Sequence, residues 1–385
     1  MGFLRIAGDT SFWEKNREKN IEIQHYIYFM PFLKIIPSFH SFSFLPKVSL
    51  GVDIGTSALK IVELSRWGDR ISLKNYGEIK AVTLFNKPFR TFKKNTFLLS
   101  SKDIARAVRA IMQEAKITTT TAVFSIPDFS SFFTSFELPP MPKEELAGAV
   151  SFEARKHVPL PLSEVVFDWQ ILSQHVQKNT PLKILLVAVP KEVVNQYQEI
   201  ATLSNLKLAA IEAEAFGLIR ATVSDTKESI IVLDIGAQST TVNMVIENSL
   251  FSSYSIDIAG NSFTERIARS LSINARQAEQ EKRTKGVDDK NISEILMPLV
   301  DLIVMEIKKS LMQFPKNSGV IKIVLGGGTA RLPGLRAYLH QQTGIVTEYA
   351  DPFRYIFYSP ILESTIKEMG PSYAVVLGVA LRGTQ

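Results

Sequence analysis

Two short Asp-x-Gly units, each following an apolar run, constrain the fold of this chain more than any other feature. The first lies in LGVDIGTSALKIVELS (50–65) and the second in IVLDIGAQSTTVNMVIENS (231–249). In both, an aspartate and a glycine interrupt the apolar run, small hydroxyl residues follow, and a second apolar run begins. A carboxylate is unfavourable in a buried hairpin unless it has a partner or a role there. The repeat of the unit predicts two similar lobes around a cleft.

A third glycine turn follows a predicted strand near the C-terminus, in IKIVLGGGTARLPGLRAYLHQQTG. Glycines in such turns let backbone N–H groups approach a phosphate or the face of a nucleotide. Asp53 and Asp234, facing each other across a cleft, would hold Mg²⁺ through its waters, because Mg²⁺ prefers oxygen ligands and keeps several waters. Each turn alone is typical of an ordinary hairpin. Together and in this order, the three turns predict a phosphate- and metal-binding cleft.

Composition sets outer limits. A chain of 385 residues predicts two or three domains. The absence of cysteine excludes disulfides, thiolate metal sites and a cysteine nucleophile, and it fits a reducing cytoplasm. No run reaches the ~20 apolar residues of a membrane helix. The net charge of +6 permits contact with an anionic membrane or nucleic acid but does not by itself favour either. We expect no nucleic-acid partner.

Two segments are expected to lie outside the ordered core. Residues 1–47 are aromatic and broken by prolines, and we expect a poorly ordered extension; the alternative is a membrane-touching segment. The segment NKPFRTFKKNTF (86–97) is basic and aromatic. We expect it to be a solvated excursion between strands, because its basic cluster is too small to favour nucleic acid or lipid. That cluster consists of Lys87, Arg90, Lys93 and Lys94.

The constellation of turns resembles the actin-like ATPase superfamily. Within it, the chain resembles the PilM family of type IV pilus assembly proteins, with the division protein FtsA as the next relative. The resemblance rests on these sequence segments: VDIGTSALKIVEL, FELPPMPKEELAGAVSFEARKHVPLPLSEVVFDWQIL, AGNSFTERIARSL with AEQEK, and VLGGGTARLPGLRAYL. It runs from about Val48 to the C-terminus. The implied fold is α/β: two lobes of duplicated sheet and helix units around a nucleotide cleft, with an inserted small α/β subdomain.

The expected domain boundaries follow from this architecture and from a change in the sequence pattern near Asp128. A strand, a helix at about Lys143 to His157, two strands and a second helix form a module of their own. We expect the first lobe at 48–127, the inserted subdomain at 128–208 and the second lobe at 209–385. The second lobe would carry a helical subdomain at about 261–318.

The resemblance implies ATP and Mg²⁺ as ligands, and it gives roles to individual residues. Lys60 matches a frequent family lysine; the alternative is an ordinary surface residue. Gly260 lies where relatives often carry two glycines, but Ala259 replaces the first. The first phosphate loop would be Asp53, Gly55, Thr56 and Ser57; the second Asp234, Gly236, Ala237, Gln238, Ser239 and Thr240; and the adenosine walls Glu279, Lys282, Gly326, Gly327, Gly328 and Thr329.

Hydrolysis needs a group that positions the attacking water. In the superfamily this is an acid or amide on the helix entering the second lobe, where this chain carries Glu212 and Glu214. The alternative is that such an acid only complements the dipole of the helix. We expect ATP to act mainly as a structural ligand, with slow hydrolysis or none, and Glu214 is the candidate catalytic residue.

The resemblance implies a cytoplasmic scaffold that captures the short cytoplasmic tail of a PilN-like inner-membrane protein. The scaffold would thereby be attached peripherally to that membrane and linked to other platform and motor proteins of the pilus. Candidate wall residues of the peptide groove are Phe152, Glu153, Val158 and Phe167, for which core packing is the alternative role.

Two other functions are weighed against the scaffold. The alternative within the superfamily is an FtsA-like protein that polymerises on membrane, and self-association stays open. A small-molecule kinase is disfavoured, because the segment EARKHVPLP, which resembles the PilM family, occupies the inserted module where such an enzyme would bind its acceptor.

Overall fold

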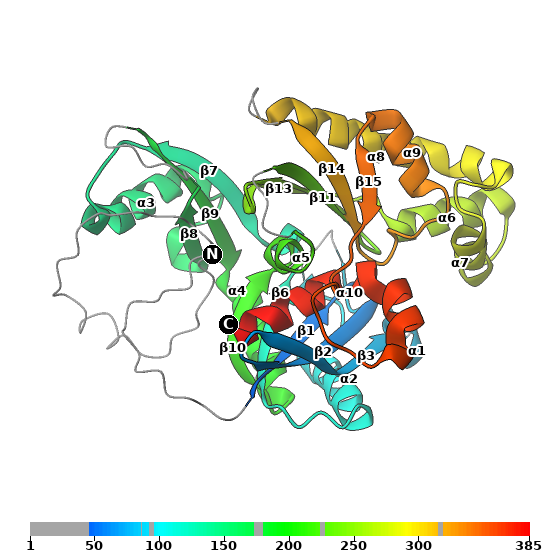
Figure 1. Cartoon of the computed structure of the whole chain (residues 1–385), viewed down its shortest axis with the longest axis horizontal. Helices are drawn as coiled ribbons and strands as arrows, with labels where there is room; N and C mark the ends of the chain where they lie inside the picture. Colours follow the sequence, from blue (N-terminus) through cyan, green and yellow to red (C-terminus); the bar gives the residue numbers. More distant parts are fainter. Residues whose placement is uncertain (1–45, 86, 92–95, 173–179, 224–227, 315–318) are drawn as a thin grey trace.

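The chain folds into two lobes and a smaller module (Figure 1). The computed structural model describes residues 46–385 except 86, 92–95, 173–179, 224–227 and 315–318. The expected N-terminal extension therefore lies outside the described residues, apart from its last two positions. Strand β1 already begins at Lys47, one residue before the expected start of the first lobe.

The first lobe is built on a five-stranded sheet. Its strands are β1 (Lys47–Ile54), β2 (Ala58–Trp67), β3 (Arg70–Lys80), β6 (Thr121–Ile126) and β10 (Lys207–Ala213). Their order is β10-β6-β1-β2-β3. The β1–β2 and β2–β3 pairs are antiparallel, and the β1–β6 and β6–β10 pairs are parallel. Strand β1 is buried from Ser49 to Ile54, as expected for a central strand covered on both faces.

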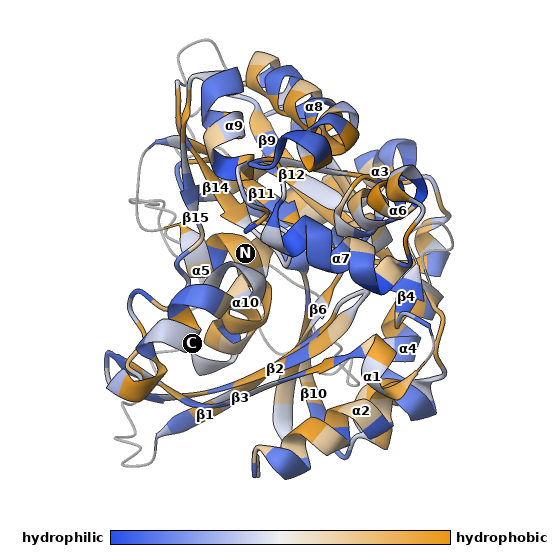
Figure 2. Cartoon of the chain, turned by 90° about the vertical axis from the view of Figure 1, so that its right-hand side faces the viewer, coloured by the Kyte–Doolittle hydropathy of each residue, from blue (hydrophilic) through white to orange (hydrophobic). Residues whose placement is uncertain are grey.

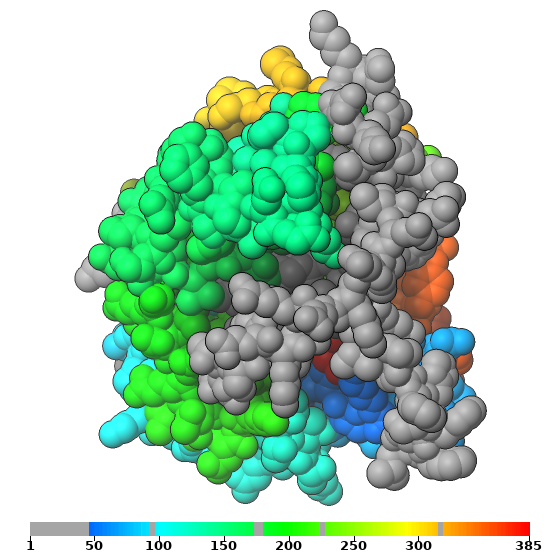
Figure 3. All heavy atoms as spheres, turned by 90° about the vertical axis from the view of Figure 1, so that its left-hand side faces the viewer, coloured from blue at the N-terminus to red at the C-terminus, as the bar shows by residue number. Residues whose placement is uncertain are grey.

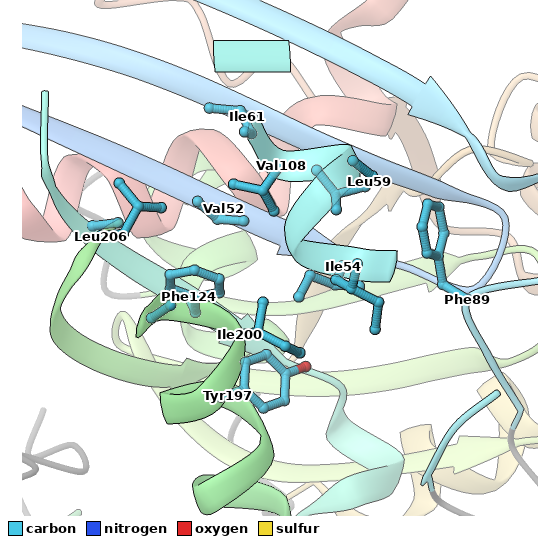
Figure 4. Packing of buried hydrophobic residues seen from close by; sticks show 14 of the residues in the cluster. Val52, Ile54, Leu59, Ile61, Phe89, Val108, Phe124, Tyr197, Ile200 and Leu206 are labelled. Atoms are coloured by element: carbon cyan, nitrogen blue, oxygen red, sulfur yellow. The ribbon is translucent and has the colours of Figure 1, made fainter. Parts of the chain in front are cut away.

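One face of this sheet is covered by α2 (Ser101–Glu114) and α4 (Lys191–Leu203). Val108 of α2 and Ile200 of α4 pack against Phe124 in the core (Figure 4). The Ser100 side chain caps α2 by accepting the N–H of Asp103 at 3.2 Å. Between β3 and α2 lie the short elements α1 (Ala81–Leu84), β4 (Arg90–Thr91) and β5 (Thr96–Phe97).

The second lobe repeats the first. Its strands are β11 (Ser229–Ile235), β12 (Thr240–Ile246), β13 (Ser249–Ile256), β14 (Val320–Gly326) and β15 (Val346–Tyr349). Their order is β13-β12-β11-β14-β15, with two antiparallel pairs followed by two parallel pairs. The order of pairing is that of the first lobe, so the duplicated α/β architecture expected from the sequence is confirmed.

Helices cover the outer face of the second sheet. These are α6 (Gly260–Leu271), α7 (Ala275–Thr284), α8 (Lys290–Gln313) and α9 (Leu335–Thr343). Phe263, Val300 and Leu339 pack with the sheet in one buried cluster. Most residues of α7 are hydrophilic, as the blue ribbon in Figure 2 shows. Among the described residues, no helix combines the length and the apolar content needed to cross a membrane.

The inserted module is a three-stranded antiparallel sheet with one helix on it. Its elements are β7 (Phe132–Leu138), α3 (Lys143–His157), β8 (Val165–Ile171) and β9 (Leu182–Pro190), with short 3₁₀ turns η2 (Asp128–Ser130) and η3 (Leu162–Glu164). The bounds of α3 agree with the expected helix. Figure 3 shows the surface of the module above that of α4 and α2.

The C-terminal part of this module differs from the expected 128–208. Helix α4 packs into the core of the first lobe through Val194, Tyr197 and Ile200. Strand β10 hydrogen-bonds to β6, so it is the edge strand of the first sheet and does not open the second lobe. The physical reason is that the apolar face of α4 is buried against the first sheet, which local sequence pattern does not reveal.

Helix α10 (Glu363–Thr384), preceded by the 3₁₀ turn η4 (Pro360–Leu362), packs on both lobes. Its Val376 and Ala380 contact the first sheet, and its Ala374 packs with the second. It crosses α5 (Glu214–Thr222) at Gly217 and Gly378, where a Cβ on Gly378 would overlap the carbonyl of Gly217. Only glycine allows two helix backbones to approach this closely.

We predict that Gly378→Ala lowers the free energy of unfolding by about 3 kcal/mol or prevents folding, because the added methyl group forces the two helices apart. Chemical denaturation of the purified variant measures this. Gly148→Ala is the matched control: that glycine lies in α3 with open space around it, so the change should stabilise by up to about 1 kcal/mol. Equal stability of Gly378→Ala and the wild type would contradict the assigned crossing.

Candidate functional site

Two matched turns face the space between the lobes. Asp53 is the penultimate residue of β1 and Asp234 that of β11, at equivalent positions of the two sheets. Each turn is closed by the same backbone bond: Gly55 N–H to the Ala58 carbonyl and Gly236 N–H to the Ser239 carbonyl, both at 3.0 Å. The two Asp-x-Gly units are therefore one local structure used twice.

A cleft of about 700 Å³, its open mouth included, lies between these turns. Its floor is completed by α10 through Pro371, Ser372 and Val375. The structure brings most of the residues expected at the site to its wall. These are Asp53, Gly55, Thr56, Ser57, Lys60, Glu214, Asp234, Gly236, Ala237, Gln238, Ser239, Gly327 and Gly328.

Two expected residues turn away from the cleft. Thr240 is fully buried in β12, and its hydroxyl donates to the carbonyl of Ile258 at 2.6 Å. Gly326 ends β14, and a Cβ there would meet the side chain of Leu218. Thr240 therefore has no free donor for a phosphate, and the glycine at 326 serves the packing of the sheet on α5. Neither lines the cleft.

A second polar cluster supports the back of the Gly236 turn. Thr329 donates to the Gly236 carbonyl at 2.8 Å, and the N–H of Gly260 bonds the same carbonyl at 3.2 Å. Lys282 donates to the Gly260 carbonyl at 3.1 Å and forms an ion pair with Glu279 at 2.5 Å. Burial lowers the pKa of Lys282, and Glu279 opposes that effect. The structure thus joins these four expected residues to one another and to the turn, behind the cleft wall.

Acidic side chains dominate the electrostatics of the cleft. Burial first, and then the charge of Asp53, raise the pKa of Asp234 to about 6. Burial and the neighbouring Asp53, Asp128 and Asp234 raise the pKa of Glu214 well above its usual value. Carboxylates that repel one another favour protonation or a bound cation. The cleft therefore favours a positively charged ligand between its two turns.

A magnesium ion fits this arrangement only through water. Asp53 accepts a hydrogen bond from Ser125 at 2.7 Å, which fixes the orientation of its carboxylate. In the described part of the chain, no group of three or more histidine, cysteine or acidic side chains is arranged to bind a metal directly. Two aspartates acting through a water shell need no such group, because Mg²⁺ keeps several waters.

The two glutamates considered for hydrolysis have different roles. Glu212 is fully buried in β10 and bonds Arg220 at 2.5 and 2.7 Å and Arg382 at 3.0 Å. Although burial alone would raise it, these arginines hold the pKa of Glu212 below its usual value. Glu212 is thus a structural ion-pair residue, and its expected alternative role in positioning water is wrong. Glu214 is the first residue of α5 and lines the cleft.

Besides the α10 residues of the floor, two charged residues at or near the cleft were missed by the sequence analysis. Arg90 was expected in a solvated loop, but it is 4% exposed and lines the cleft. Asp128 accepts the N–H of Ala215 at 3.0 Å, and its second oxygen has no partner among the described residues. Burial raises its pKa to about 7. The position of Asp128 directly after Pro127 and a buried strand was a usable signal, because strand ends in these lobes face the cleft.

Contacts also join the two lobes across the cleft. Lys60 donates to the carbonyl of Ser372 in α10 at 2.5 Å. Gln238, in the second turn, donates to the hydroxyl of Thr91 in β4 at 3.4 Å. The N–H of Gly327 bonds the Pro371 carbonyl at 2.8 Å. The three turns are thereby connected to α10 and to the edge of the first lobe.

The candidate peptide-groove residues on the module divide into two groups. Phe152 is 63% exposed on α3, and Glu153 beside it pairs with Lys156 at 2.7 Å and with His157 at 3.3 Å. Val158 is 7% exposed and lies in the core of the module, against which Phe167 also packs. Val158 is therefore a core residue, whereas Phe152 is an apolar side chain on the surface of the module.

The fold and its paired turns define a protein of the actin-like ATPase class. A solved structure of a PilM-PilN type IV pilus biogenesis complex matches with a TM-score of 0.77 and 26% identity, over 88% of this chain and 98% of the other. The ethanolamine utilization protein EutJ from Carboxydothermus hydrogenoformans matches with a TM-score of 0.54 and 15% identity, over 87% of this chain and 90% of the other. A MamK double helical filament matches with a TM-score of 0.51 and 13% identity, over 88% of this chain and 99% of the other.

The family model of the type IV pilus assembly protein PilM matches residues 51–384. The chain belongs to this family, as the sequence motifs predicted. The EutJ and MamK likenesses show the shared fold alone, because their identities are low. These comparisons do not favour the FtsA-like alternative.

We predict that Asp234→Asn stabilises the ligand-free protein near pH 7. The raised pKa means that the stability linked to the protonated carboxyl is present below about pH 4 and is lost as the pH rises through about 6. Asparagine removes this loss, so the free energy of unfolding at pH 7 should rise by about 1–2 kcal/mol. Denaturation at several pH values measures the difference, which should shrink between pH 6 and pH 4.

The control for this variant is Asp69→Asn, in the exposed β2–β3 hairpin, which should change stability by less than about 0.5 kcal/mol. A destabilised Asp234→Asn protein at pH 7 would contradict the assigned repulsion in the cleft.

Proposed function

We propose that this protein is an ATP-binding scaffold of type IV pilus assembly that captures the cytoplasmic tail of a PilN-type membrane protein. The observation that carries the proposal is the pair of matched Asp-x-Gly turns on opposite sides of one cleft, in a chain of the PilM family. The match to a PilM-PilN complex supports the choice of partner.

In this proposal, backbone N–H groups and hydroxyls of the two turns bind the phosphates. Thr56 and Ser57 come from the first turn and Ser239 from the second, all on the cleft wall. Lys60 adds a positive charge. Mg²⁺ would neutralise phosphate charge and relieve the repulsion between Asp53 and Asp234, through its waters. Gly327 and Gly328 let the adenosine approach the backbone of the second lobe.

Hydrolysis is a secondary property in this proposal. Glu214 reaches the cleft and is the residue that would orient an attacking water. Burial and neighbouring acids keep its pKa high, so it is a poor carboxylate acceptor until a cation enters. Slow turnover, with ATP acting mainly as a structural ligand, follows from this electrostatic setting.

The partner would bind to the module and tie the protein to the membrane. Phe152 on α3 offers an exposed aromatic anchor, and large apolar side chains of this kind carry much of the energy of peptide interfaces. Attachment to the inner membrane would then be peripheral and through the partner. Links to platform and motor proteins of the pilus complete the proposed scaffold role.

We predict that Asp234→Asn weakens MgATP binding at least tenfold while the fold is kept, because the metal and phosphate clamp loses one of its two carboxylates. Isothermal calorimetry measures the affinity, and circular dichroism checks the fold. Asp69→Asn is the matched control and should bind like the wild type. The assignment of the clamp would be wrong if Asp234→Asn and the wild type bound MgATP equally.

We predict saturable, nucleotide-dependent binding of a labelled PilN-type tail peptide to the full chain, measured by fluorescence anisotropy with and without MgATP. Phe152→Ala should weaken binding about tenfold, because it removes an exposed aromatic anchor. Trp67→Ala, a similarly exposed aromatic on the first lobe, is the control and should have no effect. Absence of binding in both nucleotide states would overturn the scaffold proposal.

A further inference from the structure

Arg90 is a buried arginine with unused hydrogen-bonding capacity. It lies in the two-residue strand β4 and is 4% exposed. One terminal nitrogen, Nη2, donates to the Tyr197 hydroxyl at 2.5 Å, whereas Nε has no partner among the described residues. Burying a guanidinium without satisfying its donors costs free energy. Arg90 therefore brings a positive charge to the wall of the cleft, with one donor unpaired among the described residues.

The backbone fixes Arg90 beside the first phosphate turn. The N–H of its neighbour Phe89 bonds the Thr56 carbonyl at 3.0 Å, and the N–H of Ala81 bonds the Ser57 carbonyl at 2.8 Å. The segment from β3 to β4 is therefore hydrogen-bonded to the turn at both of its ends. A phosphate held by this turn has a fixed position relative to the guanidinium.

Aromatic side chains fix the guanidinium itself. Its central carbon lies 4.6 Å from the centroid of the Phe97 ring and 5.9 Å from that of Tyr197. Burial raises the pKa of Tyr197 to about 12, so its hydroxyl stays protonated at neutral pH. Cation–π contacts of this kind hold an arginine while leaving its in-plane donors available.

Arg90 also interacts with the acidic side chains of the cleft. Its positive charge opposes the raised pKa of Glu214, the residue expected to face the attacking water. Arg90 also lines a small cavity behind the cleft together with Phe97, Phe129 and Tyr197. Gly327 and Gly328, on the adenosine side, do not border that cavity. The backbone bond from Phe89 to Thr56 places Arg90 beside the first turn, where a phosphate bound by that turn would lie.

We propose that Arg90 binds the terminal phosphate of the nucleotide and makes the cleft discriminate a nucleoside triphosphate from a diphosphate. This inference rests on the nucleotide-binding function proposed above. A planar guanidinium matches phosphate oxygens in geometry, and charge-assisted bonds of this type are about twice as strong as neutral ones. A diphosphate lacks the terminal phosphate that would contact the guanidinium, so its binding gains nothing from Arg90.

The test compares MgATP and MgADP affinities of the full chain by calorimetry. Arg90→Met keeps much of the side-chain volume and removes the charge; it should weaken MgATP about 10–100-fold and MgADP less than about threefold. Arg90→Lys keeps a charge without the planar fork and should give an intermediate loss for MgATP. Tyr197→Phe removes only the hydroxyl that positions Arg90 and should reduce the ratio of the two affinities by a smaller factor.

The matched control is Arg106→Met, an exposed arginine on α2 that also stacks on a phenylalanine, which should leave both affinities unchanged. Equal weakening of MgATP and MgADP in Arg90→Met and Tyr197→Phe would overturn the role of Arg90 and leave nucleotide binding intact. Should Arg90→Met fail to fold, the affinity ratios of Arg90→Lys and Tyr197→Phe decide the question alone. A wild-type chain that binds neither nucleotide would overturn both proposals.

Discussion

The close crossing of α5 and α10 is the contact on which the rest of the site depends. Gly217 and Gly378 let the two helix backbones meet, and α10 then packs on both sheets. From this position its Pro371 carbonyl binds the third glycine turn, and its Ser372 carbonyl accepts Lys60. The distance between the two Asp-x-Gly turns is thus set by one helix. A side chain at either glycine would move both walls of the cleft.

The acidic side chains of the cleft lower the stability of the empty protein. Asp53, Asp234 and Glu214 are brought together in partly desolvated surroundings, and burial and mutual repulsion raise the pKa values of the latter two. Such a cluster destabilises the empty protein at neutral pH and is stabilised when a cation enters. The buried Glu212 shows the opposite case, because Arg220 and Arg382 compensate its charge within the protein. Among the described residues, the former group lacks an internal counter-charge of this kind, whereas the latter is compensated within the fold.

Local signals in the sequence were sufficient for the turns and for the helix of the module. The Asp-x-Gly units, the glycine run at 326–328 and the helix Lys143–His157 all lie where their sequence patterns indicate. Roles that depend on long-range packing were less predictable. Strand β10 and helix α4 belong to the first lobe, because pairing with β6 and burial of an apolar face decide their place. No local pattern carries that information.

The sequence by itself determined the duplicated architecture, the family and the two carboxylates of the cleft, because repeated turns need glycine and an acid at fixed spacing. Only the tertiary structure decided which polar side chains are available to a ligand. It placed Arg90 in the cleft although the surrounding segment is basic and aromatic, turned Thr240 toward Ile258, and paired Glu212 with two arginines. The physical reason is that burial and hydrogen-bond partners come from residues distant in the chain.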